Sequence, residues 1–398
     1  MTGERAVQTE NVIFFLRLES KMRKYRLRIG LDVDDILYEC NTYALSLLRE
    51  KYGDDPVFDI NHIKAWGKLG DRSDERIDYF ADPDFVLHQP LFKGAQNFVR
   101  DLCRIADVFF ITSVPPQCMS ARAKRLMEDF PDVPQGNILI GTRKDLVHID
   151  ILLDDASHNI SSSQASYPVL MRKPWNTSLS GLLSVNSYSD FIHLAKTIGK
   201  SFVEKEPDLT KGGVLCLVGP TGTGKTEIAS ILTSDPRFSK PVTTTTRPRI
   251  EGEPESAYRF VSKEEFIKER DDGIFLETTV YGTFDFGTSE SQISGIVDDG
   301  KIAVIPIDIC GALTLKNKYR SKAALVFTER DKRNILVNIL GRNINVEDKI
   351  NRIMSIDFEM RNIEFCDFAV NFDTGADACV RKIYDGLGIE PPEDKQNV

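Results

Sequence analysis

The sequence predicts an α/β protein of two three-layer α/β/α domains, each built on a mainly parallel sheet. Its 398 residues are enough for two or three domains of about 150 residues. Short apolar runs typical of buried strands alternate with helical patterns, an order that favours parallel sheets covered by helices. Two of these runs, residues 28–33 and 213–218, lead directly into loops rich in catalytic residue types and then into helical patterns.

The composition is that of a globular protein. Hydrophobic residues make up 41% of the chain and charged residues 28%, which excludes disordered and fibrous classes. The 60 acidic residues outnumber the 51 basic ones, giving a net charge of −9, and both halves are negative. Such a charge disfavours non-specific binding to nucleic acid or anionic membranes. We therefore expect small ligands or proteins as partners and no stable nucleic-acid partner, with the oligomeric state left open.

The seven cysteines follow no metal-binding spacing, so we expect reduced thiols in a cytoplasmic protein. The longest apolar run near the start, residues 12–16, is too short to span a bilayer. No small-residue cleavage site follows it. We therefore expect neither a membrane anchor nor secretion.

In the first half, four further apolar runs are expected to be short buried strands: residues 108–112, 137–140, 149–153 and 167–170. The mainly helical residues between the first two strands, about 38–105, predict a small inserted cap. A polar, turn-rich stretch at 200–212 is the best candidate for a linker. The predicted division is an N-terminal extension (1–25), a first domain (26–199), the linker, a second domain (213–390) and a tail (391–398).

Polar side chains stand at the ends of the predicted strands in the first half. Asp32 and Asp34 leave the first strand, and their spacing of two directs both carboxylates the same way if the strand alternation persists. Thr112 and Ser113 end the second strand, Lys144 follows the third, and Asp154 and Asp155 end the fourth. Ligands of parallel sheets bind beyond these carboxyl ends. The plain alternative is that the acids only cap helices.

This order of Asp-x-Asp, Thr/Ser, Lys and Asp-Asp resembles the haloacid dehalogenase superfamily of phosphotransferases across residues 26–198. The runs that end at Ser113 and Asp155 look most like its cytosolic 5′(3′)-deoxyribonucleotidases. The resemblance implies that Asp32 attacks phosphorus to form an aspartyl phosphate. Asp34 would protonate the leaving oxygen and later deprotonate the hydrolytic water.

The same resemblance implies that Thr112 and Ser113 hold phosphoryl oxygens and that Lys144 offsets their charge, although the neighbouring Arg143 could serve instead. Mg²⁺ would be held by Asp32, Asp154 and the backbone carbonyl of Asp34, with Asp155 in support. Converging acids would repel one another without a cation. Three aromatic residues of the cap could stack a nucleobase but are more often core residues, and they are not assigned: Trp66, Phe80 and Phe85.

The second half opens with a phosphate-binding loop. Residues Gly219 to Thr226 fit the pattern G-x-x-x-x-G-K-T, with a strand before the loop and a helical pattern after it. Glycines let the backbone amides turn inward toward phosphate oxygens. Lys225 would supply charge to the transferred phosphoryl group and Thr226 a hydroxyl to Mg²⁺. The expected residues for the bound nucleoside triphosphate are Gly219, Thr221, Gly222, Thr223, Gly224, Lys225 and Thr226.

The chain beyond this loop resembles the guanylate kinase family, and with the loop the resemblance covers residues 213–385. It rests on the Thr-Thr-Thr-Thr-Arg-Pro-Arg run at 243–249, Gly252-Glu253, Tyr258-Arg-Phe-Val, Phe275-Leu-Glu277 and Asp308. It implies that Arg247, Arg249 and Tyr258 bind the phosphate of a nucleoside monophosphate. Glu277 and Asp308 would accept hydrogen bonds from guanine with help from Thr243, because a carboxylate selects a base edge that bears donors.

Two further segments resemble the mobile lid of that family, and they contain Arg342 and Arg352. These arginines would close on the ATP phosphates and stabilise charge in the transition state. The second domain is therefore expected to be a P-loop kinase fold with monophosphate-binding and lid segments. Three departures stand out: a shortened Arg247-Pro-Arg249 loop, Phe286 in place of a second tyrosine, and Pro306 in place of a carboxylate. They predict a slower kinase or one tuned to a variant nucleotide.

Together these patterns predict a bifunctional enzyme of nucleotide metabolism. One half would dephosphorylate (deoxy)nucleoside monophosphates with Mg²⁺, and the other would phosphorylate GMP, dGMP or a related monophosphate with ATP. A polynucleotide end-repair kinase/phosphatase is the main alternative, but it would need a basic channel. A guanylate kinase-like protein-binding module is the other alternative, and it would have no need of Lys225 and Thr226.

Overall fold

The computed structural model describes residues 26–177, 179, 181–199, 206–249, 258–281, 284–342, 344 and 346–392. The predicted extension at 1–25, the first part of the linker at 200–205, most of the tail and the Gly252-Glu253 pair lie outside these residues. Within the described part of the chain, no helix combines the length and the apolar character needed to cross a membrane.

The first half forms a six-stranded sheet in the order β3-β2-β1-β4-β5-β6, with every pair parallel. This confirms the predicted parallel arrangement and adds one short edge strand that the sequence did not indicate. The strands are β1 (Leu27–Leu31), β2 (Ala106–Thr112), β3 (Ile138–Ile140), β4 (Ile151–Asp154), β5 (Tyr167–Met171) and β6 (Ser184–Val185). The helices that pack around it are α5 (Ala95–Ile105), α6 (Met119–Asp129), α7 (Ser157–Ser162) and α8 (Tyr188–Ile198).

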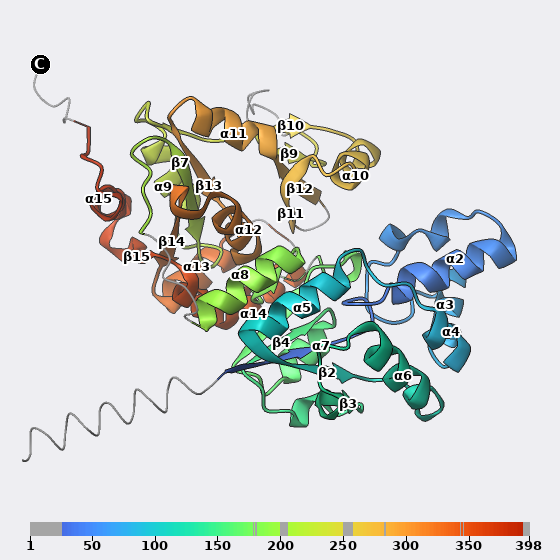
Figure 1. The fold of residues 1–398 in the computed structure, drawn as a ribbon. Helices are drawn as coiled ribbons and strands as arrows, with labels where there is room; N and C mark the ends of the chain where they lie inside the picture. Colours follow the sequence, from blue (N-terminus) through green and yellow to red (C-terminus); the bar gives the residue numbers. More distant parts are fainter. Residues whose placement is uncertain are drawn as a thin grey trace, which may run out of the picture.

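The inserted segment between β1 and β2 is shorter than predicted. It contains α2 (Cys40–Tyr52), three short 3₁₀ turns, α3 (Arg76–Tyr79) and α4 (Pro83–His88), which lie together to one side of the sheet (Figure 1). The prediction extended this cap to residue 105. Helix α5 belongs instead to the core layer, because Phe98 and Leu102 are buried with Ile29 and Leu31 of β1.

The second half is built on a five-stranded parallel sheet in the order β15-β14-β7-β13-β8. Its strands are β7 (Gly213–Val218), β8 (Phe238–Ser239), β13 (Ile302–Pro306), β14 (Ala323–Glu329) and β15 (Phe368–Asn371). The helices are α9 (Lys225–Leu232), α11 (Glu290–Asp298), α12 (Ile309–Tyr319), α13 (Lys332–Leu340), α14 (Val346–Arg361) and α15 (Ala376–Leu387). Every residue of β7 is buried, which explains its unbroken apolar run.

A second, four-stranded sheet in the order β10-β9-β12-β11 projects from this half and is partly antiparallel. It consists of β9 (Thr244–Thr245), β10 (Arg259–Phe260), β11 (Phe275–Tyr281) and β12 (Phe284–Ser289), beside α10 (Lys263–Asp271). This sheet carries most of the segment that resembles the monophosphate-binding part of guanylate kinases.

The two halves pack against each other through α8 and α12, which lie side by side between the sheets (Figure 1). The Asn317 side chain donates hydrogen bonds of 2.9 Å to Ser189 and to Asp190. Thr314 donates to the same Asp190 carboxylate at 3.1 Å. Asp190 is buried, so these bonds satisfy a polar group that would be costly to leave unpaired.

Candidate active sites

Three buried carboxylates meet at the carboxyl ends of β1 and β4. The strands are neighbours with Leu31 opposite Leu153, so the register places Asp32 next to Asp154. One ligand atom each from Asp32, Asp154 and Asp155 lies within 4.8 Å of the other two. Three hard oxygen donors converging in this way fit a divalent cation such as Mg²⁺.

Lys144 joins this cluster from the turn after β3. Its ammonium group lies 2.8 Å from Asp32 and 2.8 Å from Asp154. Burial alone would lower the pKa of Lys144, but the two carboxylates outweigh burial and raise it. Burial, followed by the charge of Asp154, raises the pKa of Asp32 to about 7. Arg143, the alternative to Lys144, pairs instead with Asp145 at 2.6 Å on the surface.

The Asp34 carboxylate lies outside this three-carboxylate cluster. It accepts a 2.5 Å hydrogen bond from Arg122 of α6 and a 3.1 Å bond from Gln89, just after α4. Arg122 is fully buried. Neither Arg122 nor Gln89 was singled out from the sequence, because each meets Asp34 only through the tertiary fold.

Thr112 ends β2, the other neighbour of β1, and Ser113 follows it in the chain. The Thr112 hydroxyl is buried and has no hydrogen-bond partner among the described residues. Ser113 lines a cavity of about 350 Å³ together with Asp32, Asp34 and Lys144. The structure therefore places Ser113 at the cavity wall and Thr112 beside it in the sheet.

Aromatic residues of the insertion divide between this cavity and the core. Trp66 and Phe80 line the cavity, and Trp66 is 51% exposed. Phe85 is buried and stacks on Tyr43 with ring centroids 5.1 Å apart. Phe85 is thus a core residue, whereas Trp66 and Phe80 face the space above the acidic cluster.

The segment after β5, residues 173–176, forms hydrogen bonds to Asp155 of the three-carboxylate cluster. Trp175 donates a 2.8 Å hydrogen bond to the Asp155 carboxylate, and the Asn176 side chain donates to the Asp155 carbonyl at 2.9 Å. Burial lowers the pKa of Lys173, opposed by the carboxylates of Asp35 and Asp155. These contacts fix the orientation of Asp155, and none of them follows from a sequence pattern.

In the second half, the loop between β7 and α9 has the backbone that its glycines predict. Gly219, Gly222 and Gly224 have φ values of 139°, 95° and 83°, which residues with a Cβ rarely adopt. A Cβ on Gly224 would also overlap the Phe372 ring. The Thr223 hydroxyl bonds to the Pro220 carbonyl and is buried. Only the backbone of Thr223 therefore remains for the predicted phosphate contact.

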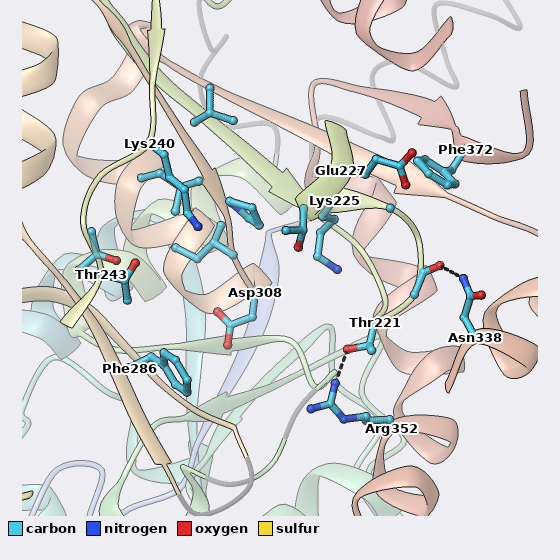
Figure 2. Close-up of a pocket in the computed structure, with 18 of the residues that line it drawn as sticks. Thr221, Lys225, Glu227, Lys240, Thr243, Phe286, Asp308, Asn338, Arg352 and Phe372 are labelled. Atoms are coloured by element: carbon cyan, nitrogen blue, oxygen red, sulfur yellow. Dashed lines mark hydrogen bonds between the residues drawn. The ribbon is translucent and has the colours of Figure 1, made fainter. Parts of the chain in front are cut away.

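A cavity of about 510 Å³ opens beside this loop. Figure 2 shows Lys225 and Asp308 around the same space, with Arg352 at its edge beside Thr221. The predicted site residues that line it are Thr221, Gly222, Gly224, Lys225, Thr226, Thr243, Tyr258, Asp308, Arg342 and Arg352. These residues from separate segments of the chain thus converge on one cavity.

Helices α13 and α14, which the resemblance assigns to a lid, contact the phosphate-binding loop. Arg352 of α14 donates a 3.2 Å hydrogen bond to the Thr221 hydroxyl, and Asn338 of α13 donates a 3.1 Å bond to the Gly222 carbonyl (Figure 2). Burial lowers the pKa of Lys225 to about 8, and the positive charges of Arg342 and Arg352 add to this effect. Several cations facing one cavity create a site suited to a polyanionic ligand.

The predicted monophosphate-binding arginines are not among the residues that line this cavity. The Arg247 guanidinium lies 5.3 Å from the Tyr258 ring centroid, and Arg249 is exposed on the loop. Lys240, which no sequence pattern singled out, lines the cavity and lies 5.5 Å from the same ring. The side chain of Glu277 lies outside the described part of the structure.

Asp308 caps the start of α12, and one of its oxygens accepts a 2.8 Å hydrogen bond from the Gly311 amide. Phe286 and Pro306, two of the three departures from the family pattern, line the same cavity. Thr288 lines it as well and was missed from the sequence. The altered positions therefore stand where they would meet a bound ligand.

Each half of the chain matches the model of a known protein family. The family model described as "Guanylate kinase" matches residues 211–382. The model described as "5' nucleotidase, deoxy (Pyrimidine), cytosolic type C protein" matches residues 26–200.

Individual relatives match the second half. The guanylate kinase of Wolinella succinogenes is 34% identical over 168 residues, which cover 40% of this chain and 77% of the relative. The guanylate kinase of Clostridium tetani is 34% identical over 188 residues, which cover 46% of this chain and 88% of the relative. The crystal structure of guanylate kinase from Anaplasma phagocytophilum is 22% identical with a TM-score of 0.36, and the match covers 45% of this chain and 86% of that one. The chain belongs to the guanylate kinase family and joins that kinase domain to a nucleotidase-like phosphatase domain in one bifunctional enzyme of nucleotide metabolism.

Proposed function

We propose that the N-terminal domain hydrolyses (deoxy)nucleoside monophosphates and that the C-terminal domain phosphorylates GMP or dGMP with ATP. The observation that supports both assignments is convergence: each domain brings phosphate-handling side chains from several separate segments to one cavity. The family matches supply the class of substrate.

In the phosphatase domain, Asp32 is the proposed nucleophile because it lies at the cavity wall beside Lys144. Its oxygen would bond to phosphorus while the phosphorus–oxygen bond to the nucleoside breaks. Asp34 would give a proton to that leaving oxygen and then take one from the water that hydrolyses the aspartyl phosphate. Ser113 would hold a phosphoryl oxygen from the cavity wall.

Mg²⁺ bound by Asp32, Asp154 and Asp155 would offset the charge of the phosphate. Lys144 already bridges two of these carboxylates. It would therefore keep the acids together and turn toward the phosphate as the substrate binds. The insertion residues Trp66 and Phe80 would cover the nucleoside.

In the kinase domain, the phosphate-binding loop and Lys225 would hold the ATP phosphates, with Thr226 as a ligand for Mg²⁺. Arg342 and Arg352 would offset charge as the phosphoryl group passes to the monophosphate. Asp308 and Thr243 would accept hydrogen bonds from the guanine base and so orient it. Tyr258 and Lys240 would face the phosphate of the nucleoside monophosphate.

A substrate panel of GMP, dGMP, dTMP and dUMP tests both assignments, with the wild-type chain compared with Asp32→Asn and Lys225→Ala. We expect Asp32→Asn to abolish phosphate release and leave ADP formation unchanged, and Lys225→Ala to do the reverse. A wild-type chain that turns over none of the four would contradict the proposal. Turnover only on oligonucleotide ends would favour the end-repair alternative.

A further inference from the structure

Arg172 stands at the boundary between the two domains. It follows β5 of the phosphatase domain, and its side chain is 12% exposed. Its Nε donates to the Ser184 hydroxyl at 3.1 Å, and its Nη1 donates to the carbonyls of Asn176 at 3.1 Å and Leu179 at 2.6 Å. Three acceptors of the phosphatase domain therefore fix the guanidinium in place.

The remaining nitrogen of this guanidinium faces the kinase domain. Nη2 of Arg172 lies 3.9 Å from Oδ2 of Asp308. The other carboxylate oxygen of Asp308 accepts the capping bond from Gly311. Asp308 lines the kinase cavity, and Arg172 is not among the residues that do. The ion pair with Asp308 therefore connects Arg172 to the lining of that cavity.

The packing of α12 sets the relative positions of these two groups. Asp308 caps the first turn of α12, and Asp190 of α8 anchors the same helix through Thr314 and Asn317. Ser184, which holds Arg172, is fully buried. Both charged groups thus stand on rigid elements that are fixed to each other.

We propose that Arg172, supplied by the phosphatase domain, is a positioning residue for the nucleobase pocket of the kinase domain. It would hold Oδ2 of Asp308, the carboxylate oxygen that does not cap α12, in position to accept hydrogen bonds from the N–H groups of guanine. This inference rests on the proposed function, in which Asp308 binds the base. Its consequence is that the affinity of the kinase for GMP depends on a side chain of the other domain.

Kinetics on the full chain test the proposal. Arg172→Ala is expected to raise the KM for GMP about fivefold, the upper range for a partly exposed ion pair, with kcat and the KM for ATP changed less than twofold. Arg172→Lys keeps a positive charge and should recover part of the loss. Arg320→Ala is the matched control. Arg320 contacts His193 across the same interface at 2.6 Å, but at the far end of α12, about 18 Å from Asp308 by the helix rise.

A double-mutant cycle separates positioning from general damage. Arg172→Ala should raise the KM for GMP in the wild-type background and change it little when Asp308→Asn is already present. Equal effects in both backgrounds would overturn the proposal, as would a parallel rise in the KM for ATP or the same defect in Arg320→Ala. An unchanged KM in Arg172→Ala would overturn this inference alone. A wild-type chain that does not phosphorylate GMP would overturn the proposed function and this inference together.

Discussion

The guanidinium of Arg122 donates a 2.5 Å hydrogen bond to the carboxylate of Asp34, the proposed general acid of the phosphatase domain. Two other nitrogens of Arg122 are buried without a hydrogen-bond partner among the described residues. Such a group is costly to bury, so its presence beside Asp34 points to a role in positioning that carboxyl group.

Replacing Arg122 should therefore harm catalysis more than stability. Arg122→Met is expected to lower the phosphatase kcat about 100-fold, the lower range for loss of acid–base catalysis, with ADP formation by the kinase unchanged. Lys124→Met, a change at an exposed position of the same helix, serves as the control and should keep full activity. Equal phosphatase rates in Arg122→Met and wild type would exclude the positioning role.

Substitution of Phe286 is expected to strengthen the binding of GMP. It lines the kinase cavity next to Tyr258, with the ring centroids 6.0 Å apart. Phe286→Tyr would add a hydroxyl donor for the substrate phosphate, and a hydrogen bond to a charged group contributes roughly 1.5 kcal/mol or more. We expect the KM for GMP to fall about tenfold, measured by a coupled assay. Phe260→Tyr places a hydroxyl outside the cavity lining and should leave the KM as it is.

The three-carboxylate cluster predicts stabilisation by metal. A cation that binds only the folded chain raises the midpoint of thermal unfolding, and the buried acids repel one another without one. In the absence of nucleotide, Mg²⁺ should raise the Tm of the wild-type chain by a few degrees relative to EDTA. The same comparison on Asp154→Asn should show no shift. Asp145→Asn, which alters a carboxylate paired with Arg143 on the surface, should retain the wild-type shift.

The sequence predicted the parts of both sites that local patterns encode. The phosphate-binding loop is continuous in the chain, so its glycines and Lys225 could be assigned directly. Asp32 and Asp154 are far apart in sequence, but parallel strands bring their carboxyl ends to one edge of the sheet. The order of strand-end residues was therefore sufficient to place them together.

Some residues of the two sites meet only through long-range contacts, and these could not be predicted from the sequence. Arg122 and Arg172 meet Asp34 and Asp308 across 88 and 136 positions, and an arginine in a helix or after a strand carries no local signal of its partner. The extent of the insertion was overestimated for a related reason. The helical pattern of α5 does not show that its apolar face covers the sheet rather than the insertion.

Cys310 reports on the contact between the domains through its reactivity. It lies in the first turn of α12 and is buried. Burial, with a smaller contribution from the charge of Asp308, raises the pKa of its thiol to about 12. Only the thiolate reacts with iodoacetamide, so at pH 8 nearly all Cys310 thiols would be neutral and unreactive. Cys103, which is only partly buried, should be alkylated first.

The rate at which Cys310 is alkylated is expected to depend on pH. Because burial both keeps the Cys310 thiol neutral and shields it from the reagent, its alkylation should be slower than that of Cys103 at pH 8 and should become faster as the pH rises. Mass spectrometry of the labelled native chain measures the rate at each cysteine. Labelling of Cys310 as fast as Cys103 at pH 8 would show that α12 is not held against the phosphatase domain, since a free α12 would expose this thiol to solvent and return its pKa toward the ordinary value.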